Sequence, residues 1–364
     1  MKRLCILAPE FIPTWGGVGT YCVNLVKELS NNYEVHVITP KRGKNYNSLK
    51  IEKELNIKIH NITYANDSFF YNFKFQLGLL FKFWSLNKKY NFNIIHSANL
   101  VHMPDIWLKF FSSYRKIPHL VTIHTLIETQ LEATNLSKSK RSFCELMSLI
   151  FYPYIKFLQK IYIKKSKNFV TVSHFYAKKI KELYNINVNV IYNGVDKNIF
   201  YKVNKKEASE KFNLKSNKKK ILYVGRLLAQ KGIFDLINAV KDLDVELIIV
   251  GHGAKIDNIK CLGYIDNNDL KYIYSSVDLL VLPSYYENFP MSIIEALSCE
   301  CKVIASNVGG IPEILDRKYM FKPGNISEIK KKINETLDSS YNFKEFSAKK
   351  MAEEMKTIYE NLNY

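Results

Sequence analysis

Short apolar runs alternate along the chain with loops and with stretches of helical spacing. An apolar run at residues 3–8 precedes helical spacing over 21–29 and a second apolar run at 33–38. This alternation is typical of α/β proteins. Further runs of the same kind predict buried strands at 57–60, 93–96, 119–124, 168–172, 188–192, 221–224, 246–250, 279–282 and 303–305. Because the runs are continuously apolar, we expect parallel sheets covered on both faces.

The apolar runs fall into two series. Asn193-Gly194 closes the first, and the polar, lysine-rich segment 197–220 separates it from the second. A chain of 364 residues is longer than one hydrophobic core usually serves. We therefore predict an N-terminal domain over residues 1–196 and a C-terminal domain over 197–346.

The end of the chain, about residues 347–364, predicts one more helix. Met351, Met355, Ile358 and Leu362 recur there at helical spacing, so one face of this helix must dock on a core. Packing back on the N-terminal domain is one option. Periodicity alone does not say which domain receives it.

Composition favours a folded soluble protein and leaves the partners open. Hydrophobic residues make up 47% of the chain and charged residues 24%, which is far from the composition of disordered chains. The formal net charge of +19 would favour anionic partners such as nucleic acid, anionic lipid or phosphorylated substrates. Lys, Asn, Ile, Tyr and Phe are abundant together, which suggests that a compositional bias of the source genome accounts for part of this excess.

Cysteine spacing and hydropathy predict a cytoplasmic protein without a spanning segment. The six cysteines are scattered, and only Cys299 and Cys301 are close, so no zinc site or disulfide framework is visible. Residues 1–9 are too short an apolar run for a signal peptide. No run approaches the roughly 18 apolar residues of a membrane-spanning helix.

A basic loop follows the strand predicted at 221–224. Gly225 and Arg226 come directly after that strand, and Lys231 precedes a helix predicted over 233–243. Ligands of open α/β sheets bind beyond the carboxyl ends of the strands. An arginine fork, a lysine charge and the free amides of a helix start together suit a diphosphate. The alternative is that a lysine-rich chain places two cations in this loop by chance.

An acidic pair lies in the stretch Y-Y-E-N-F-P-M-S-I-I-E-A. A strand over 278–284 and a helix over 291–298 are predicted on either side of its loop. Glu287 borders the loop, and Glu295 leans back toward the same opening because helical side chains point toward the N-terminus. Two such carboxylates can accept hydrogen bonds from the vicinal hydroxyls of a sugar. The alternative is that they only complement the helix dipole.

The N-terminal half offers weaker signals. Gly16, Gly17 and Gly19 permit close approach to a ligand, but Cys22 stands where a dinucleotide fingerprint needs its third glycine, so we reject NAD binding. His124 ends the strand predicted at 119–124, where a structural role is the alternative to a site role. The D-x-D of Asp242-Leu-Asp244 lies before a strand, and we interpret it as a solvated turn.

Taken in order, these motifs resemble a known family. The stretch E-N-F-P-M-S-I-I-E-A is similar to the E-x7-E element of the retaining nucleotide-sugar glycosyltransferases of family 4. V-G-R-L-L-A-Q-K-G, I-I-V-G-H-G, V-I-Y-N-G-V-D, S-N-V-G-G-I-P-E-I and the glycine-rich loop also match. The resemblance implies the GT-B fold, in which two Rossmann-like α/β domains with parallel sheets face an interdomain cleft.

The resemblance also implies roles for individual residues. Arg226 and Lys231 would hold the donor diphosphate and stabilise its charge as it leaves. Glu287 would contact sugar hydroxyls, and Glu295 would bind the nucleotide ribose. His124 would orient the sugar, so the predicted catalytic residues are His124, Arg226, Lys231 and Glu287.

Further residues are predicted to line the donor pocket. The amides of Phe289, Met291 and Ser292 would border the sugar and phosphates, and the base would lie near Tyr264 and Ile265. Gly17 would approach the phosphate from the N-terminal domain. The predicted donor site includes these residues together with Gly225 and Asn288, and Asn288 stands where the family often has glycine.

The predicted reaction is glycosyl transfer with retention at the anomeric carbon, with no protein nucleophile evident. The donor would be a UDP- or GDP-sugar, with no cofactor and no metal, and the acceptor a glycan or a lipid-linked sugar. Segments 69–90 and 143–167 mix aromatic and basic residues, so they are either ordinary surface helices or contacts to the anionic inner face of a membrane. Alternatives are a nucleotide-sugar epimerase or glycan phosphorylase of similar fold, or a basic nucleic-acid-binding α/β protein. Glu287 and Glu295 would repel nucleic acid, and no nucleic-acid module is visible.

Overall fold

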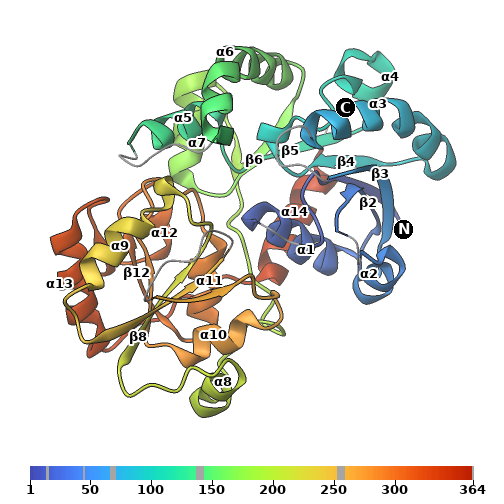
Figure 1. The fold of residues 1–364 in the computed structure, drawn as a ribbon. Helices are drawn as coiled ribbons and strands as arrows, with labels where there is room; N and C mark the ends of the chain where they lie inside the picture. The colour runs from blue at the N-terminus through green and yellow to red at the C-terminus, as the bar shows by residue number, and fades with distance from the viewer. Residues whose placement is uncertain (14–15, 44–45, 66–70, 137–142, 252–258, 363–364) are drawn as a thin grey trace. The chain divides into compact units, whose positions relative to one another are not determined.

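A computed structural model of the chain describes residues 1–13, 16–43, 46–65, 71–136, 143–251 and 259–362 (Figure 1). The chain divides into two compact units. Unit 1 contains Met1–Glu128, Phe143–Gly194 and Ala348–Tyr364, and unit 2 contains Thr129–Ser142 and Val195–Ser347.

Unit 1 is built on a parallel sheet of seven strands in the order β3-β2-β1-β4-β5-β6-β7. The strands are β1 (Arg3–Leu7), β2 (Glu34–Lys41), β3 (Lys58–Tyr64), β4 (Ile94–Ser97), β5 (His119–Ile123), β6 (Asn168–Thr171) and β7 (Asn189–Val190). The helices are α1 (Gly17–Leu29), α2 (Ser48–Leu55), α3 (Tyr71–Tyr90), α4 (Ser112–Arg115), α6 (Phe143–Lys164), α7 (His174–Tyr184) and α14 (Ala348–Glu360), with short 3-10 turns η1 (Leu100–His102) and η2 (Leu108–Phe110). Helix α5 (Ile127–Leu136) begins in unit 1, and from Thr129 on it belongs to unit 2.

Both faces of this sheet are buried, as its continuous apolar strands predict. Alternate residues of β1 enter different cores, because successive strand side chains point to opposite faces. Leu4 and Ile6 pack with α1 and α14, whereas Cys5 and Leu7 pack with α3. Unit 1 therefore has two hydrophobic layers around one sheet.

The C-terminal helix α14 packs in unit 1. Its Met351, Met355 and Tyr359 are buried in the same core as Tyr21 and Leu25 of α1. The Tyr359 hydroxyl also lies 2.6 Å from Nδ1 of the buried His96 in β4. The last helix of the chain thus completes the core of the first unit.

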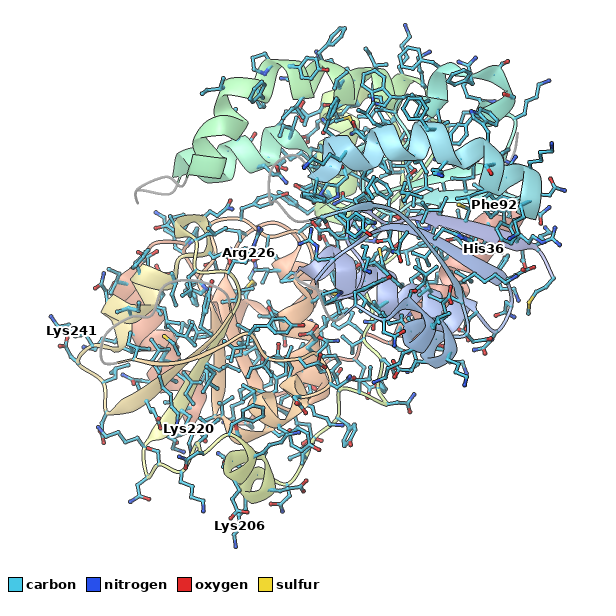
Figure 2. The ribbon with its side chains drawn as sticks, turned by 45° about the vertical axis from the view of Figure 1, so that its right-hand side comes forward. His36, Phe92, Lys206, Lys220, Arg226 and Lys241 are labelled. Atoms are coloured by element: carbon cyan, nitrogen blue, oxygen red, sulfur yellow. The ribbon has the colours of Figure 1, made fainter. Side chains whose placement is uncertain are left out.

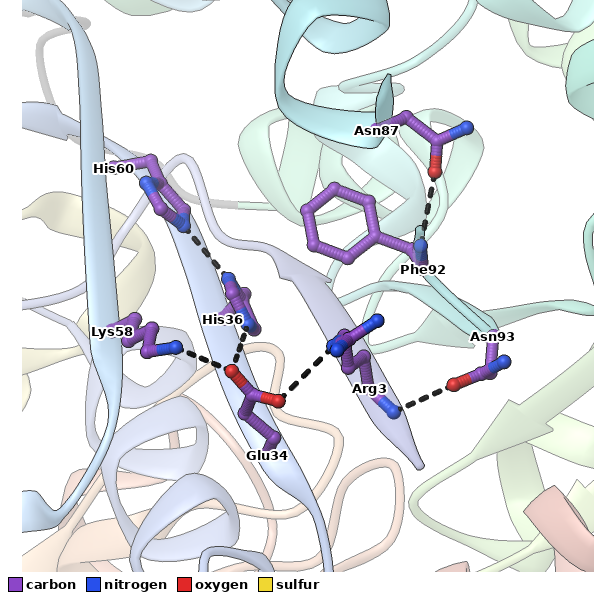
Figure 3. A network of polar contacts seen from close by, with 8 residues as sticks. All are labelled: Arg3, Glu34, His36, Lys58, His60, Asn87, Phe92 and Asn93. Carbon is purple, nitrogen blue, oxygen red and sulfur yellow. Dashed lines mark hydrogen bonds and ion pairs between the residues drawn. The ribbon is translucent and has the colours of Figure 1, made fainter. Parts of the chain in front are cut away.

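A polar network fastens the amino ends of the first three strands (Figure 3). Glu34 of β2 forms ion pairs with Arg3 of β1, at 3.1 Å, and with Lys58 of β3. His36 and His60 are 2.9 Å apart between Nδ1 and Nε2. Burial lowers the pKa of His36 and brings the pKa of His60 to about 4, so both imidazoles are neutral at pH 7. This network lies at the opposite edge of the sheet from the loops that follow the strands.

Unit 2 has a parallel sheet of six strands in the order β10-β9-β8-β11-β12-β13. The strands are β8 (Lys219–Val224), β9 (Val245–Val250), β10 (Lys260–Gly263), β11 (Leu279–Leu282), β12 (Lys302–Ser306) and β13 (Met320–Phe321). The helices are α8 (Lys205–Lys211), α9 (Ile233–Val240), α10 (Leu270–Ser276), α11 (Met291–Ser298), α12 (Ile311–Ile314) and α13 (Ile326–Leu337), with 3-10 turns η3 (Ala229–Lys231) and η4 (Arg317–Tyr319).

Every strand predicted from the apolar runs overlaps an observed strand, whereas β10 and β13 were missed. The helix predicted over 233–243 is shorter, since α9 ends at Val240. Asp242 and Asp244 are exposed, and each forms an ion pair with a lysine, at 3.6 and 2.7 Å, as a solvated turn would. In the described part of the chain, no group of three or more His, Cys, Asp or Glu side chains could hold a metal ion, and no helix is long and apolar enough to cross a membrane.

Candidate functional site

The strand order of unit 2 defines where a ligand would bind. The chain runs from β8 outward through β9 to β10, then returns to the other side of β8 with β11. Ligands of open α/β sheets bind at the carboxyl edge where the strand order reverses in this way. That point lies between β8 and β11, and the loops after these two strands carry Arg226, Lys231 and Glu287.

An ion pair joins the two loops. The Lys231 ammonium lies 2.6 Å from Oε1 of Glu287, and both side chains are largely shielded from solvent. Ser284, just after β11, donates its hydroxyl to the same carboxylate oxygen at 2.8 Å. A fixed carboxylate beside a fixed ammonium presents both a hydroxyl acceptor and an anion-binding charge at one place.

Arg226 begins the same loop from β8, with its side chain exposed (Figure 2). Its carbonyl accepts a 2.8 Å hydrogen bond from the hydroxyl of the buried Tyr223. Burial raises the pKa of Tyr223, the charge of Glu287 raises it further and the charge of Arg226 lowers it. Arg226 and Glu287 are thus both close enough to act electrostatically on one buried phenol.

Two glycines let neighbouring loops touch at this edge. A Cβ on Gly232, which has φ +67°, would lie 2.0 Å from the carbonyl oxygen of Pro283. A Cβ on Gly309, which has φ +56°, would lie 1.7 Å from the carbonyl oxygen of Glu287. A side chain at either position would force the backbone apart and disfavour the left-handed conformation. The loops after β8, β11 and β12 therefore support one another around Glu287.

Glu295 lies in α11 and is buried. The Tyr274 hydroxyl from α10 donates to its Oε2 at 2.9 Å. Burial raises the pKa of Glu295 to about 7, and the Tyr274 hydrogen bond opposes part of this rise. Glu295 is therefore partly protonated at neutral pH, unlike an exposed carboxylate.

The rest of the predicted donor pocket surrounds the start of α11. Asn288, Phe289 and Met291 are buried, and Pro290, the N-cap residue of α11, makes no side-chain hydrogen bond to the amides of the first turn, which Ser292 shares. Tyr264 and Ile265 directly follow β10, and Tyr264 is exposed. In the predicted I-I-V-G-H-G motif, His252 and Gly253 lie outside the described residues.

Unit 1 holds the other two predicted site residues. Gly17 is exposed at the start of α1, after the loop that follows β1, while Thr14 and Trp15 of the glycine-rich stretch lie outside the described residues. His124 is buried after β5, with its ring 4.5 Å from that of Tyr21 in an edge-on contact. Burial lowers the pKa of His124 to about 3, so the imidazole is neutral.

The sequence did not predict Ser284, Tyr223 and Tyr274, which donate hydrogen bonds to the predicted site residues. Ser284 is three positions before Glu287 and could have been proposed as its partner, because a hydroxyl there reaches the same loop. Tyr223 and Tyr274 offered no such signal. Tyr274 precedes Glu295 by 21 residues, and only the packing of α10 against α11 brings them together.

The fold and the site define a class. Two α/β units with parallel sheets, and charged side chains gathered at the carboxyl edge of one sheet, are features of the GT-B glycosyltransferases. Sequence profiles for Glycosyltransferase Family 4 and for Glycosyl transferases group 1 match residues 15–198 and 204–357, respectively. The chain belongs to glycosyltransferase family 4.

Relatives match over nearly the whole chain. An uncharacterised glycosyltransferase of Methanocaldococcus jannaschii is 27% identical over 98% of both chains. N-acetyl-alpha-D-glucosaminyl L-malate synthase of Bacillus anthracis is 23% identical over 95% of this chain and 94% of its own. The capsular polysaccharide biosynthesis glycosyltransferase CapH of Staphylococcus aureus is 26% identical over 94% and 95%.

Solved structures show the same fold. Sucrose-phosphate synthase from Thermosynechococcus elongatus superposes with a TM-score of 0.79 at 20% identity, over 100% of this chain and 99% of its own. Anabaena HepE in complex with UDP and glucose gives a TM-score of 0.75 at 17% identity, over the full length of both chains. The GT-B fold predicted from the sequence is confirmed.

Proposed function

We propose that this glycosyltransferase moves a hexose or N-acetylhexosamine from a nucleotide-sugar to a glycan or lipid-linked acceptor, with retention, in the synthesis of cell-surface polysaccharide or glycolipid. The observation that carries the donor side is the Lys231–Glu287 ion pair at the strand-order reversal of unit 2. It sets an anion-binding charge beside a hydroxyl-binding carboxylate, which is what a sugar diphosphate needs.

In this proposal the leaving nucleoside diphosphate is stabilised by fixed positive charge. Arg226 is exposed and offers its guanidinium fork, and Lys231 is already oriented by Glu287. Charge placed in advance where negative charge develops lowers the barrier without reorganisation. Arg226 and Lys231 supply the counter-charge, so the proposal includes no cofactor and no metal.

Glu287 and Glu295 would hold hydroxyls of the donor. Ser284 and Lys231 fix the Glu287 carboxylate for the sugar, and Tyr274 fixes that of Glu295 for the ribose. Gly225, Asn288, Phe289, Met291 and Ser292 would line the pocket, and Tyr264 and Ile265 would contact the base. The roles of Gly17 and His124, in unit 1, rest on the family resemblance.

The names of relatives support the substrate classes. HepE has also been solved in complex with UDP-glucose, which favours a UDP-sugar over other donors, with a GDP-sugar as the alternative. CapH of S. aureus is named for capsular polysaccharide, and the B. anthracis enzyme for an N-acetylglucosaminyl product. The first name supports a cell-surface polysaccharide as the product, and the second supports an N-acetylhexosamine as the transferred sugar.

The donor site is tested by thermal shift with UDP-, GDP- and ADP-sugars, followed by transfer assays with the one that binds. A ligand that binds only the folded state raises the melting temperature. We expect Lys231→Ala and Glu287→Ala each to lower turnover about 100-fold or more, on the scale of losing one preorganised charge-stabilising group. The control is Lys241→Ala, an exposed lysine of the same unit (Figure 2). Near-normal transfer by either site variant would overturn the assignment.

Retention is tested on the product. The anomeric configuration of the transferred sugar, followed by proton NMR from the start of the reaction, should match that of the donor. An inverted product formed first would refute the retaining mechanism while leaving the donor site intact.

Contact with an anionic membrane is a further part of the proposal. Ile150, Tyr154 and Phe157 of α6 are 55–61% exposed, and their spacing puts them on one helical face. Lys160 and Lys164 extend that face with positive charge. We expect the wild type to float with phosphatidylglycerol vesicles and Tyr154→Ser/Phe157→Ser to bind them at least tenfold more weakly. The control Lys178→Ser, a change on another helix, should float as the wild type does. Equal flotation of all three proteins would contradict this contact.

A further inference from the structure

A basic pocket lies in unit 1, away from the loops that carry Gly17 and His124. It has a volume of about 50 Å³ and opens where β5 and β6 begin. This is the amino edge of the parallel sheet, whereas the loops that carry Gly17 and His124 follow the carboxyl ends of β1 and β5. The pocket is therefore separate from the site described above.

Positive side chains dominate the lining of this pocket. Lys109, Arg115, Lys165 and Lys167 line it together with His119 and four uncharged residues, and no acidic side chain of the described residues does. Three of these cations come from two short segments, the end of α4 and the turn after α6. Like charges brought together repel one another unless an anion joins them.

A buried acid, Asp105, contacts the lining of the pocket and already has several partners. Asp105 lies beneath the lining and accepts hydrogen bonds from the hydroxyls of Ser97, Tyr114 and Tyr162. Its Oδ2 is also 3.3 Å from the Lys109 ammonium and 3.2 Å from Nε2 of His119. These contacts hold the pKa of Asp105 below its ordinary value, so it stays a single negative charge. That charge balances Lys109 and leaves Arg115 and Lys165 in excess.

The buried ammonium of Lys109 has donors to spare. It is 2% exposed, its one described carboxylate partner is Asp105, and its other near neighbour is the ring of Tyr162, at 4.8 Å from the ring centroid. An ammonium has three donors. Among the described residues, neither Arg115 nor Lys165 has a carboxylate within ion-pair distance. Burial keeps the pKa of His119 at about 3, so its imidazole adds no charge.

We propose that this pocket binds a phosphate group. Arg115 supplies a planar fork for two phosphate oxygens, and Lys165 and Lys109 supply ammonium donors. The volume of about 50 Å³ is enough for a few waters or one small oxyanion, and too small for a nucleotide. The bound anion offsets the repulsion among the excess cations.

Two sources share this chemistry. Phe110 and Phe111 are about half exposed beside the pocket, and the Lys165 ammonium lies 4.5 Å from the ring centroid of Phe110. Exposed aromatic rings beside a phosphate pocket suit a phospholipid headgroup, and the pocket alone suits free phosphate. Separate arms of one experiment distinguish the two.

The first arm is titration calorimetry with inorganic phosphate at constant ionic strength. We expect a dissociation constant of about 1 mM or tighter, weakened at least tenfold in Arg115→Gln/Lys165→Gln. Neither side chain belongs to the buried Asp105 network, so the variant should fold. Lys116→Gln, an exposed neighbour outside the lining, is the matched control. Lys231→Ala should keep this binding, because Lys231 is not part of the pocket and any phosphate bound at the proposed donor site is a separate event.

The second arm is sedimentation with phosphatidylglycerol and phosphatidylcholine vesicles. Binding to phosphatidylglycerol that needs Arg115 and Lys165 and that phosphate competes away identifies the headgroup. Phosphate binding in calorimetry without such vesicle binding identifies free phosphate. If phosphate binding is absent, or is lost in Lys231→Ala but kept in Arg115→Gln/Lys165→Gln, the pocket is not a phosphate site. That result leaves the proposed transfer reaction standing, and failure of the transfer assay leaves this pocket standing.

Discussion

Glu295 is a carboxyl group whose ionisation the fold opposes. Burial raises its pKa to about 7 from an ordinary value of 4.5. Because the folded protein holds this proton more tightly than the unfolded chain, the contribution of Glu295 to the free energy of unfolding is complete below about pH 4.5. It is lost as pH rises through about 7. The two pKa values differ by roughly 2.5, which corresponds to about 3 kcal/mol.

We therefore expect Glu295→Gln to remove one component of the pH dependence of stability. Between pH 5 and pH 8, the free energy of unfolding of unit 2 should fall by roughly 2 to 3 kcal/mol more in the wild type than in the variant. Glutamine keeps an oxygen for the Tyr274 hydroxyl, so the hydrogen bond survives. Urea unfolding at several pH values checks this, with the exposed Glu210→Gln as control. Parallel pH profiles for wild type and Glu295→Gln would show that Glu295 ionises freely.

At this scale the sequence predicted positions better than partners. It placed Lys231 and Glu287 in loops at strand ends, and the structure joins them at 2.6 Å. Their direct pairing was not predicted, because 56 residues separate them and the contact depends on β8 lying next to β11. The catalytic and binding roles of these residues stay predictions.

Among the elements, α13 has an unusual C-terminal anchor. The ammonium of Lys302, the first residue of β12, donates to the carbonyls of Thr336, Leu337 and Ser339 at 3.2, 2.7 and 2.6 Å. The last carbonyls of a helix lack partners within the helix and carry partial negative charge. One lysine thus satisfies three acceptors and fastens the helix to the sheet.

Lys302→Met should keep the packing of the stem and lose this anchor. We expect unit 2 to be destabilised by about 2 to 3 kcal/mol, on the scale of hydrogen bonds to a charged group at a helix end. Lys331→Met, on the exposed face of α13, removes only a surface ion pair with Glu335 and should cost less than about 1 kcal/mol. Denaturant unfolding compares the two. Equal losses would mean that the three carbonyls are satisfied by water as well as by Lys302.

The two strands that were not predicted lack a continuous apolar run, which is the main sequence signal of a buried strand. β10 contains Lys260 and ends at Gly263, and β13 has two residues, so neither forms an apolar run of strand length. Both lie at the edges of the unit 2 sheet, where one side of a strand has no partner to bury it. Central strands such as β8 and β11 are recognisable because burial on both faces demands apolar residues.

At the scale of the whole molecule, periodicity could not supply the strand order. In both sheets the order in which strands are added reverses next to the first strand, between β1 and β4 in unit 1 and between β8 and β11 in unit 2. Local pattern shows that strands and helices alternate, but many orders of parallel strands satisfy that alternation. The family resemblance supplied the fold. The helix at 347–364 illustrates the same limit, since its apolar stripe predicted that one face is buried but not against which of the two cores.

The packing of α14 makes the end of the chain part of the first core. Met351, Met355 and Tyr359 pack with α1, while the core of unit 2 is built from other residues, around β8, β11 and α13. Met355→Ala leaves a cavity in the unit 1 core, and buried methionine truncations cost about 2 to 5 kcal/mol. We expect hydrogen exchange measured by mass spectrometry to accelerate in β1 and α1 and to stay unchanged in β8 and β11. Lys356→Ala, the next residue on the partly exposed face, should change neither unit. Faster exchange in both units by the same factor would mean that the chain unfolds as one cooperative body, and that the two cores are not energetically independent.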